Sequence, residues 1–216
     1  PAATEALDVM IPQYLGDLIA WSAIGARTSE SQVHRELASG LSTPVGFKNA
    51  TDGSLAGAVN AIRTALESHH FLGITDDALP AIFCTSGNPY PHIVLRGGPR
   101  PNYDRASVAA CEQALAEAGL RQVIMVDCSH GNSAKDYRRQ AVVLRDVLRQ
   151  IEEGNRSIIG FMLESHLEAG RQPLAGGRET LRHGVSITDA CLGFDDSAAL
   201  LRGLAQAVRE RRRAAG

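Results

Sequence analysis

Residues 123–130, Val-Ile-Met-Val-Asp-Cys-Ser-His, decide the fold, because they end a hydrophobic strand with side chains that do chemistry. Three further segments are built the same way, with an apolar strand that leads into a cation: residues 23–27 (Ala-Ile-Gly-Ala-Arg), 45–49 (Val-Gly-Phe-Lys-Asn) and 93–98 (Ile-Val-Leu-Arg-Gly-Gly). Polar groups at the C-terminal ends of parallel strands, between amphipathic helices, are how an α/β barrel builds an active site. The four segments therefore predict an α/β barrel in which these residues face one pocket.

The polar residues at these strand ends have the charges of an anion-binding site. Arg27, Lys48 and Arg96 are cations, and His130 is a candidate metal ligand. Arginine suits bidentate pairing with phosphate or carboxylate, and lysine adds a compact charge. Each cation could instead be an ordinary solvated surface charge. Their shared position after apolar strands favours an enzyme with a phosphorylated substrate.

Strand and helix patterns alternate along the chain, which indicates βα units and a parallel sheet. Residues 28–31 (Thr-Ser-Glu-Ser) are predicted to cap a helix that carries Val33, Leu37 and Leu41 at helical spacing. Residues 158–163 are wholly apolar or glycine, which predicts a strand covered on both faces.

Other patterns fill in the order of elements. Residues 71–75 and 81–85 are predicted to form a β-hairpin inserted between barrel units. Residues 104–118 read as an alanine-rich helix stopped by Gly119, and a final helix is expected over residues 197–211.

Length and composition limit the class of protein. A chain of 216 residues supports one domain with a sizeable core. A net charge of -2 provides no global basic field, so no nucleic-acid partner is expected. The four cysteines contain no CxxC pair, and no signal peptide or apolar run of membrane-spanning length is seen. We therefore expect a reduced, cytoplasmic protein with no membrane partner.

Three residues are candidate metal ligands. His130, Glu164 and Asp189 each follow a strand or stand in a loop at a strand's end. One imidazole and two carboxylates suit a divalent first-row metal such as Mn, Fe, Co or Zn. The three are far apart in sequence, and a lone histidine is often only a structural hydrogen-bonding group. The residues alone leave both readings open.

Long motifs carry a resemblance to a known family. They are residues 21–49 (WSAIGARTSESQVHRELASGLSTPVGFKN), 92–98 (HIVLRGG), 126–133 (VDCSHGNS) and 186–191 (SITDAC). In order and over essentially the whole chain, they resemble type I 3-deoxy-D-arabino-heptulosonate 7-phosphate (DAHP) synthase, the first enzyme of the shikimate pathway. The resemblance implies condensation of phosphoenolpyruvate with erythrose 4-phosphate to DAHP and phosphate, towards aromatic amino acids.

The resemblance also implies roles for individual residues. His130, Glu164 and Asp189 match the family's metal ligands, to which a cysteine outside this chain would be added. Phosphoenolpyruvate would be held by residues at the strand ends: Glu5, Ala26, Arg27, Lys48 and Arg96. The catalytic residues would be His130, Lys48 and Asp189.

Feedback control is implied as well, by an aromatic amino acid bound near the inserted hairpin. The residues expected to bind this effector are Pro12, Gln13, Leu41, Ser42, Phe71 and Gly73. In the family, glycine at position 73 tends to accompany inhibition by tyrosine, whereas serine at this position tends to accompany inhibition by phenylalanine. Tyrosine is therefore the inhibitor expected here. Gly73 could equally serve only to bend its strand. A homo-oligomer is expected for the full-length protein.

Measured against the family pattern, the chain is expected to be one (β/α)8 barrel domain over residues 1–216 that lacks the first two strands. The absent part would contain the cysteine ligand and the loop that binds erythrose 4-phosphate. The chain alone is therefore expected to be inactive. Two alternatives stay open: an inactive fragment or regulatory pseudoenzyme of the family, and another metal-dependent phosphosugar aldolase.

Overall fold

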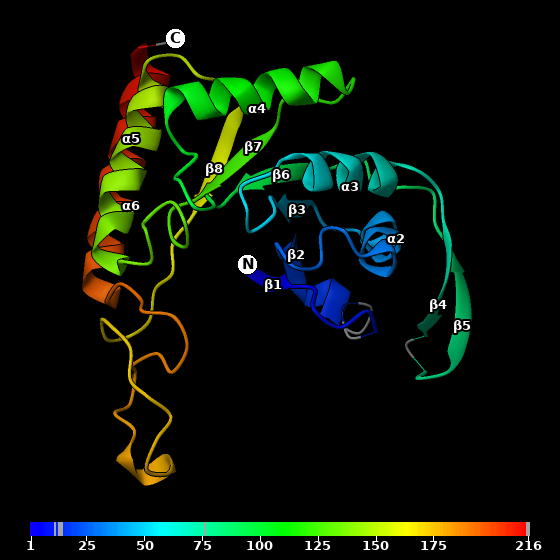
Figure 1. Cartoon of the computed structure of the whole chain (residues 1–216), viewed down its shortest axis with the longest axis horizontal. Helices are drawn as coiled ribbons and strands as arrows, with labels where there is room; N and C mark the ends of the chain where they lie inside the picture. The colour runs from blue at the N-terminus through cyan, green and yellow to red at the C-terminus, as the bar shows by residue number, and fades with distance from the viewer. Residues whose placement is uncertain (11, 13–14, 76, 215–216) are drawn as a thin grey trace. The chain divides into compact units, whose positions relative to one another are not determined.

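The computed structural model describes residues 1–10, 12, 15–75 and 77–214. Figure 1 labels their helices and strands along the chain. Their contacts divide the chain into two compact units, each discontinuous in sequence. The first unit contains Pro1–Leu95 and Ala109–Met125, and the second contains Arg96–Val108 and Val126–Gly216. Each is a mixture of helices and parallel strands, in agreement with the predicted α/β class. The expected single domain stays a prediction.

Parallel strands form the centre of the first unit. In hydrogen-bonded order they are β1 (Ala2–Glu5), β2 (Ile19–Ile24), β3 (Val45–Lys48) and β6 (Pro91–Leu95), with the start of β7 (Ile124–Asp127) beside β6. The 3-10 turn η1 (Gly16–Leu18) precedes β2. Ile24, Phe47 and Ile93 are fully buried. The register pairs Glu5 with Ala23 and Lys48 with Val94, so the strands end at one common edge.

Helices of the first unit cover these strands with small and aliphatic side chains. They are α2 (Gln32–Gly40), α3 (Ala56–Leu66) and the main part of α4 (Arg105–Glu117). Leu37 and Ile62 are buried, and Gly119 adopts a φ of +71° just after α4, as its predicted helix-stopping role requires. This left-handed conformation carries no Cβ penalty in glycine.

The helix α2 differs in two details from the prediction. The side chain of Val33 is 53% exposed and Leu41 follows the helix, so only Leu37 of the three apolar residues is both helical and buried. Ser31 precedes the helix, but its hydroxyl makes no capping bond. It lies instead 2.7 Å from Nδ1 of His34, because that ring, one turn later, competes for the hydroxyl.

The predicted hairpin is confirmed. Strands β4 (His70–Ile74) and β5 (Pro80–Cys84) pair antiparallel. The rings of Phe71 and Phe83, which are paired across the two strands, stack with their centroids 5.8 Å apart. Gly73 pairs regularly with Ala81, so the strand contains no bulge at this glycine. Thr85 Oγ1 lies 2.7 Å from Ser39 Oγ, which joins the hairpin to the last turn of α2.

A hydrogen-bonded aromatic pair lies among the strands of the first unit. The Nε1–H of Trp21 donates to Nε2 of His92 over 3.0 Å, and Nδ1 of His92 lies 3.2 Å from the Tyr90 carbonyl oxygen. Burial lowers the pKa of His92 below its usual value. A Cβ added to Gly46 would lie 2.5 Å from Trp21 Cζ2 and 2.7 Å from Val94 Cγ2. Glycine at position 46 is therefore what lets the ring of Trp21 pack here.

The second unit contains the end of β7 beside β8 (Ile158–Met162), together with α5 (Gln140–Glu152) and α6 (Phe194–Ala214). Two 3-10 turns, η2 (Tyr137–Arg139) and η3 (Arg178–Thr180), lie in its connections. The final helix is thus longer than predicted. Ile158 is buried but Ile159 is 58% exposed, so the prediction of a strand covered on both faces is wrong at this residue. Successive side chains of a strand point to opposite faces, and the face of Ile159 lacks a full cover.

Two further findings bear on the class of protein. Among the helices of the described residues, none combines the length and the apolarity needed to cross a membrane. All four cysteines are unpaired thiols. Burial raises the pKa of the Cys111 thiol to about 12, which keeps it protonated and unreactive.

Candidate active site

His130 stands in a tight turn directly after β7. Its φ of +51° is left-handed, which is uncommon for a residue with a side chain. Asp127 shapes the turn, because its Oδ1 accepts hydrogen bonds from the Ser129 N–H (2.9 Å) and the Ser129 hydroxyl (2.7 Å). The carbonyl of His130 accepts from the Lys135 N–H over 2.9 Å. The surrounding hydrogen bonds therefore hold His130 in its strained conformation.

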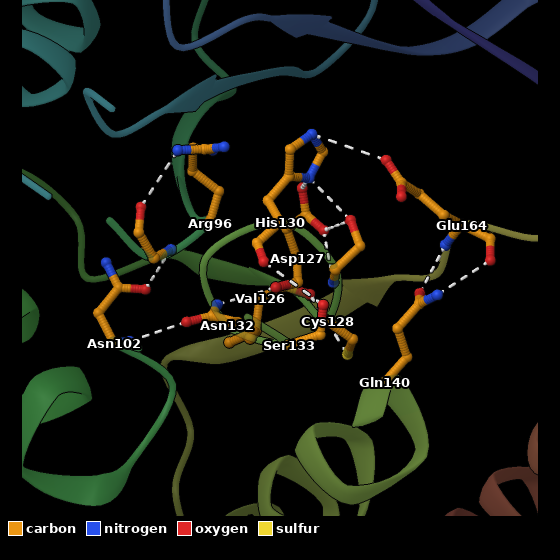
Figure 2. A network of polar contacts seen from close by, with 12 residues as sticks. Arg96, Asn102, Val126, Asp127, Cys128, His130, Asn132, Ser133, Gln140 and Glu164 are labelled. Atoms are coloured by element: carbon orange, nitrogen blue, oxygen red, sulfur yellow. Dashed lines mark hydrogen bonds and ion pairs between the residues drawn. The ribbon is translucent and has the colours of Figure 1, made fainter. Parts of the chain in front are cut away.

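The imidazole of His130 is oriented by a buried carboxylate. Its Nδ1 lies 3.0 Å from Oδ2 of Asp127, whose side chain is fully buried, and 2.7 Å from the Ser129 hydroxyl. A proton on Nδ1 that is donated to Asp127 leaves the lone pair of Nε2 available as a ligand. Nε2 lies 3.6 Å from Oε1 of Glu164, and Figure 2 shows the two groups facing each other.

The three predicted metal ligands are brought together. Glu164 follows β8, and Asp189 lies in the exposed segment that precedes α6. One ligand atom from each of His130, Glu164 and Asp189 lies within 4.8 Å of the others. An imidazole nitrogen and two carboxylate oxygens at this spacing fit a divalent first-row metal ion. All three residues belong to the second unit.

Two residues of this site have roles that sequence reasoning missed. Asp127 was visible in the motif before His130, and a carboxylate that immediately follows a buried strand was the available signal. The side chain of Gln140 bonds two backbone groups of Glu164: its Nε2 donates to the carbonyl over 3.1 Å, and its Oε1 accepts from the N–H over 2.7 Å. No local pattern marks Gln140, because its partner lies 24 residues away.

The loop of Arg96 packs directly on the turn of His130. Gly131 N–H donates to the Arg96 carbonyl over 3.1 Å. Gly97 has a φ of +73°, and a Cβ at this position would lie 2.6 Å from the Asn132 nitrogen. Glycine at position 97 therefore lets the backbone of this loop approach the backbone of residues 131–132 closely.

Side-chain amides secure this contact (Figure 2). Asn102 Oδ1 accepts from the Gly97 N–H over 2.7 Å, and the Asn102 N–H donates to Oδ1 of Asn132 over 2.8 Å. Nδ2 of Asn132, which is fully buried, donates to the Asp127 carbonyl over 2.8 Å. The backbone at Arg96 and Gly97 is thus held by the same hydrogen-bond network that shapes the turn of His130.

The remaining predicted substrate residues lie at one edge of the first unit. Glu5 ends β1, Ala26 and Arg27 follow β2, and Lys48 ends β3. Lys48 is 9% exposed, which is unusual for a lysine, whereas Arg27 and Glu5 are exposed. Oε1 of Glu5 lies only 2.1 Å from where a Cβ of Gly25 would be, so the missing side chain makes room for this carboxylate.

Five of the six residues predicted to bind an effector are described, and these five belong to the first unit. Leu41 and Ser42 follow α2, and Phe71 and Gly73 belong to β4, which contacts α2. Pro12 is buried. Gln13 lies outside the described residues.

These features define an α/β protein with a candidate divalent-metal site at the ends of its parallel strands and with cations at other strand ends. The chain belongs to the DAHP synthetase I family, whose family model matches residues 1–202. The resemblance inferred from the four motifs is therefore confirmed.

Relatives and a solved structure support this assignment. The chain is 59% identical to the Tyr-sensitive phospho-2-dehydro-3-deoxyheptonate aldolase of Salmonella typhimurium, over 94% of this chain and 57% of the relative. It is 55% identical to the Phe-sensitive enzyme of Escherichia coli, over 98% of this chain and 60% of the relative. The structure of the Francisella tularensis aldolase matches 98% of this chain and 61% of its own, with 48% identity and a TM-score of 0.92. The chain thus spans about three fifths of the length of these relatives.

Proposed function

We propose that the protein is a metal-dependent DAHP synthase that condenses phosphoenolpyruvate with erythrose 4-phosphate and releases phosphate. The observation that carries the proposal is the grouping of His130, Glu164 and Asp189 within 4.8 Å, in a chain of this family. The relatives are named phospho-2-dehydro-3-deoxyheptonate aldolases. This name describes the same reaction by its product, DAHP. Neither the pseudoenzyme nor another phosphosugar aldolase is favoured by any of these observations.

The metal would be held by Nε2 of His130 and by carboxylate oxygens of Glu164 and Asp189. Mn, Fe, Co and Zn all accept this donor set. When bound, such an ion supplies a Lewis acid that can polarise the aldehyde oxygen of erythrose 4-phosphate. Asp127 would keep the proton of His130 on Nδ1, so that Nε2 faces the metal as a ligand.

Phosphoenolpyruvate would be held by Arg27, Lys48 and Arg96, with the Ala26 N–H directed to its phosphate. Lysine and arginine supply charge-assisted hydrogen bonds to the phosphate and the carboxylate. The burial of Lys48 would strengthen its bond to the substrate, because charges interact more strongly away from water. Glu5 would position the water that attacks the substrate. Lys48, His130 and Asp189 would be the catalytic residues.

The remaining proposals concern the whole protein. Its parallel strands would form part of a complete eight-stranded barrel with the hairpin β4–β5 inserted, and the protein would work as a cytoplasmic homo-oligomer. An aromatic amino acid would inhibit it through Pro12, Gln13, Leu41, Ser42, Phe71 and Gly73. The relatives carry both Tyr-sensitive and Phe-sensitive names, and we propose tyrosine here.

Phosphate release from the full-length protein tests the proposed reaction. Activity should require both substrates and a divalent metal, and chelation should abolish it reversibly. His130→Ala should lose metal and activity together, because it removes the imidazole ligand. His166→Ala is the matched control, since this exposed histidine lies outside the ligand group. Full metal content and full activity in His130→Ala would refute the assignment.

A further inference from the structure

The side-chain amide of Gln140 lies against the backbone of Glu164 (Figure 2). Gln140 is the first residue of α5, and it is fully buried. Its Nε2 donates to the Glu164 carbonyl over 3.1 Å, and its Oε1 accepts from the Glu164 N–H over 2.7 Å. One side chain thus makes the pair of hydrogen bonds that a neighbouring strand would make.

This pairing lies just past the end of β8. Two residues before Glu164, the Met162 carbonyl accepts from the Cys128 N–H over 2.9 Å. Beyond it, the Glu164 carbonyl accepts from Gln140 and also from the Leu192 N–H, at 2.9 Å. Leu192 comes shortly after Asp189. The peptide of Glu164 therefore connects α5 to the segment of another proposed ligand.

We propose that Gln140 is a positioning residue of the metal centre, which holds the Glu164 backbone so that its carboxylate faces Nε2 of His130. This inference rests on the proposed metal site. A metal ligand must keep its place to within a fraction of an ångström, and its supporting hydrogen bonds are what hold it. Past the end of β8, the parallel bridge between Ser165 and Leu192 engages the carbonyl of Glu164. Gln140 engages both the N–H and the carbonyl of Glu164, and so holds this residue from the side of α5.

The same helix offers a matched control. Gln150 is also on α5 and also buried, with 3% of its surface exposed. Its Nε2 donates to the Tyr103 carbonyl over 2.8 Å and to Oδ1 of Asp146 over 2.7 Å. Replacing either glutamine removes a buried amide from α5, but only Gln140 bonds a proposed ligand residue.

The test compares Gln140→Met and Gln150→Met in the full-length protein. Methionine keeps the length of the side chain and removes both hydrogen-bonding groups. Mn²⁺ affinity is measured by titration calorimetry, and the geometry of the site by the visible spectrum of bound Co²⁺. Gln140→Met should bind Mn²⁺ about 10–100-fold more weakly and change the Co²⁺ spectrum. Gln150→Met should retain the affinity and the spectrum of the unaltered protein, even where it lowers the unfolding temperature.

Unchanged Mn²⁺ affinity in folded Gln140→Met would overturn the inference, as would an equal loss in both variants. Should Gln140→Met fail to fold, Gln140→Asn provides the same test, because its shorter amide cannot reach both atoms of Glu164. Gln140→Asn should also bind Mn²⁺ more weakly, and an unaltered Mn²⁺ affinity would contradict the positioning role of Gln140. Glu164→Gln separates the two proposals: if it leaves Mn²⁺ binding intact, the metal site itself is wrong and this inference falls with it. If Glu164→Gln loses Mn²⁺ and Gln140→Met does not, only the positioning role is wrong.

Discussion

Oδ2 of Asp127 lies 3.0 Å from Nδ1 of His130, three residues further along the chain. A fully buried carboxylate that receives the Nδ1 proton determines which nitrogen of the ring is free to bind a metal. The interaction is local in sequence, yet it depends on the left-handed backbone of His130.

Asp127→Asn should weaken divalent-metal binding about 10–100-fold, because the amide no longer holds the proton on Nδ1. Calorimetric titration with Mn²⁺ measures this loss. Asp195→Asn, at an exposed position in the first turn of α6, serves as the control and should bind as the unaltered protein does. Equal affinity in the two variants would contradict the orienting role.

His92 should make the stability of the first unit depend on pH. Burial lowers its pKa in the folded state, so the unfolded chain takes up the proton first as the pH falls. The contribution is fully present above the unfolded value of about 6.5 and is lost progressively below it. His92→Gln should therefore reduce the pH dependence of the unfolding free energy in this range. Urea unfolding followed by the fluorescence of Trp21, the only tryptophan of the chain, measures it. An unchanged slope with pH would disprove the prediction.

Gly97→Ala should destabilise the loop of Arg96 by more than the ordinary cost of a left-handed alanine. Gly119 has nearly the same φ, +71° against +73°, but nothing lies within 4 Å of the position of its Cβ. Gly119→Ala should cost about 1 kcal/mol from backbone strain alone. Gly97→Ala adds a clash with the backbone of Asn132, and denaturant titrations should show the larger loss. Equal losses would mean that the neighbouring loop yields freely.

Lys48→Met and Arg96→Ala should each weaken phosphoenolpyruvate binding by roughly 1.5–3 kcal/mol, since each removes a charged hydrogen bond. Calorimetry on the full-length protein gives the affinity. Arg63→Ala, an exposed cation in the last turn of α3, is the control. Unchanged affinity in both test variants would end the proposal that these cations hold the substrate.

Gly73→Ser should shift inhibition from tyrosine towards phenylalanine, because a side chain at this buried position of β4 reduces the room for a phenolic hydroxyl. Inhibition curves for both amino acids on the full-length protein measure the shift. Leu79→Ser alters the exposed turn of the same hairpin and should leave the preference unchanged. Stronger inhibition of the unaltered protein by phenylalanine than by tyrosine would defeat this prediction.

The sequence by itself determined the elements and the ends of the strands. Apolar runs that stop at Arg27, Lys48, Arg96 and Asp127 predict strands and their polar ends, because a run of apolar residues is a local property of the sequence. The hairpin β4–β5 and the stop at Gly119 were predictable for the same reason. The candidate ligands came from the resemblance, since spacing alone left them open.

Only the tertiary structure decided which of these residues meet and what holds them. Gln140 reaches Glu164 across 24 residues and Trp21 reaches His92 across 71, through contacts that depend on packing and strand register. The hydroxyl of Ser31 hydrogen-bonds the ring of His34 instead of capping the helix α2. Side-chain hydrogen bonds go to whichever partner the folded chain brings within about 3 Å, and sequence distance carries no information about that.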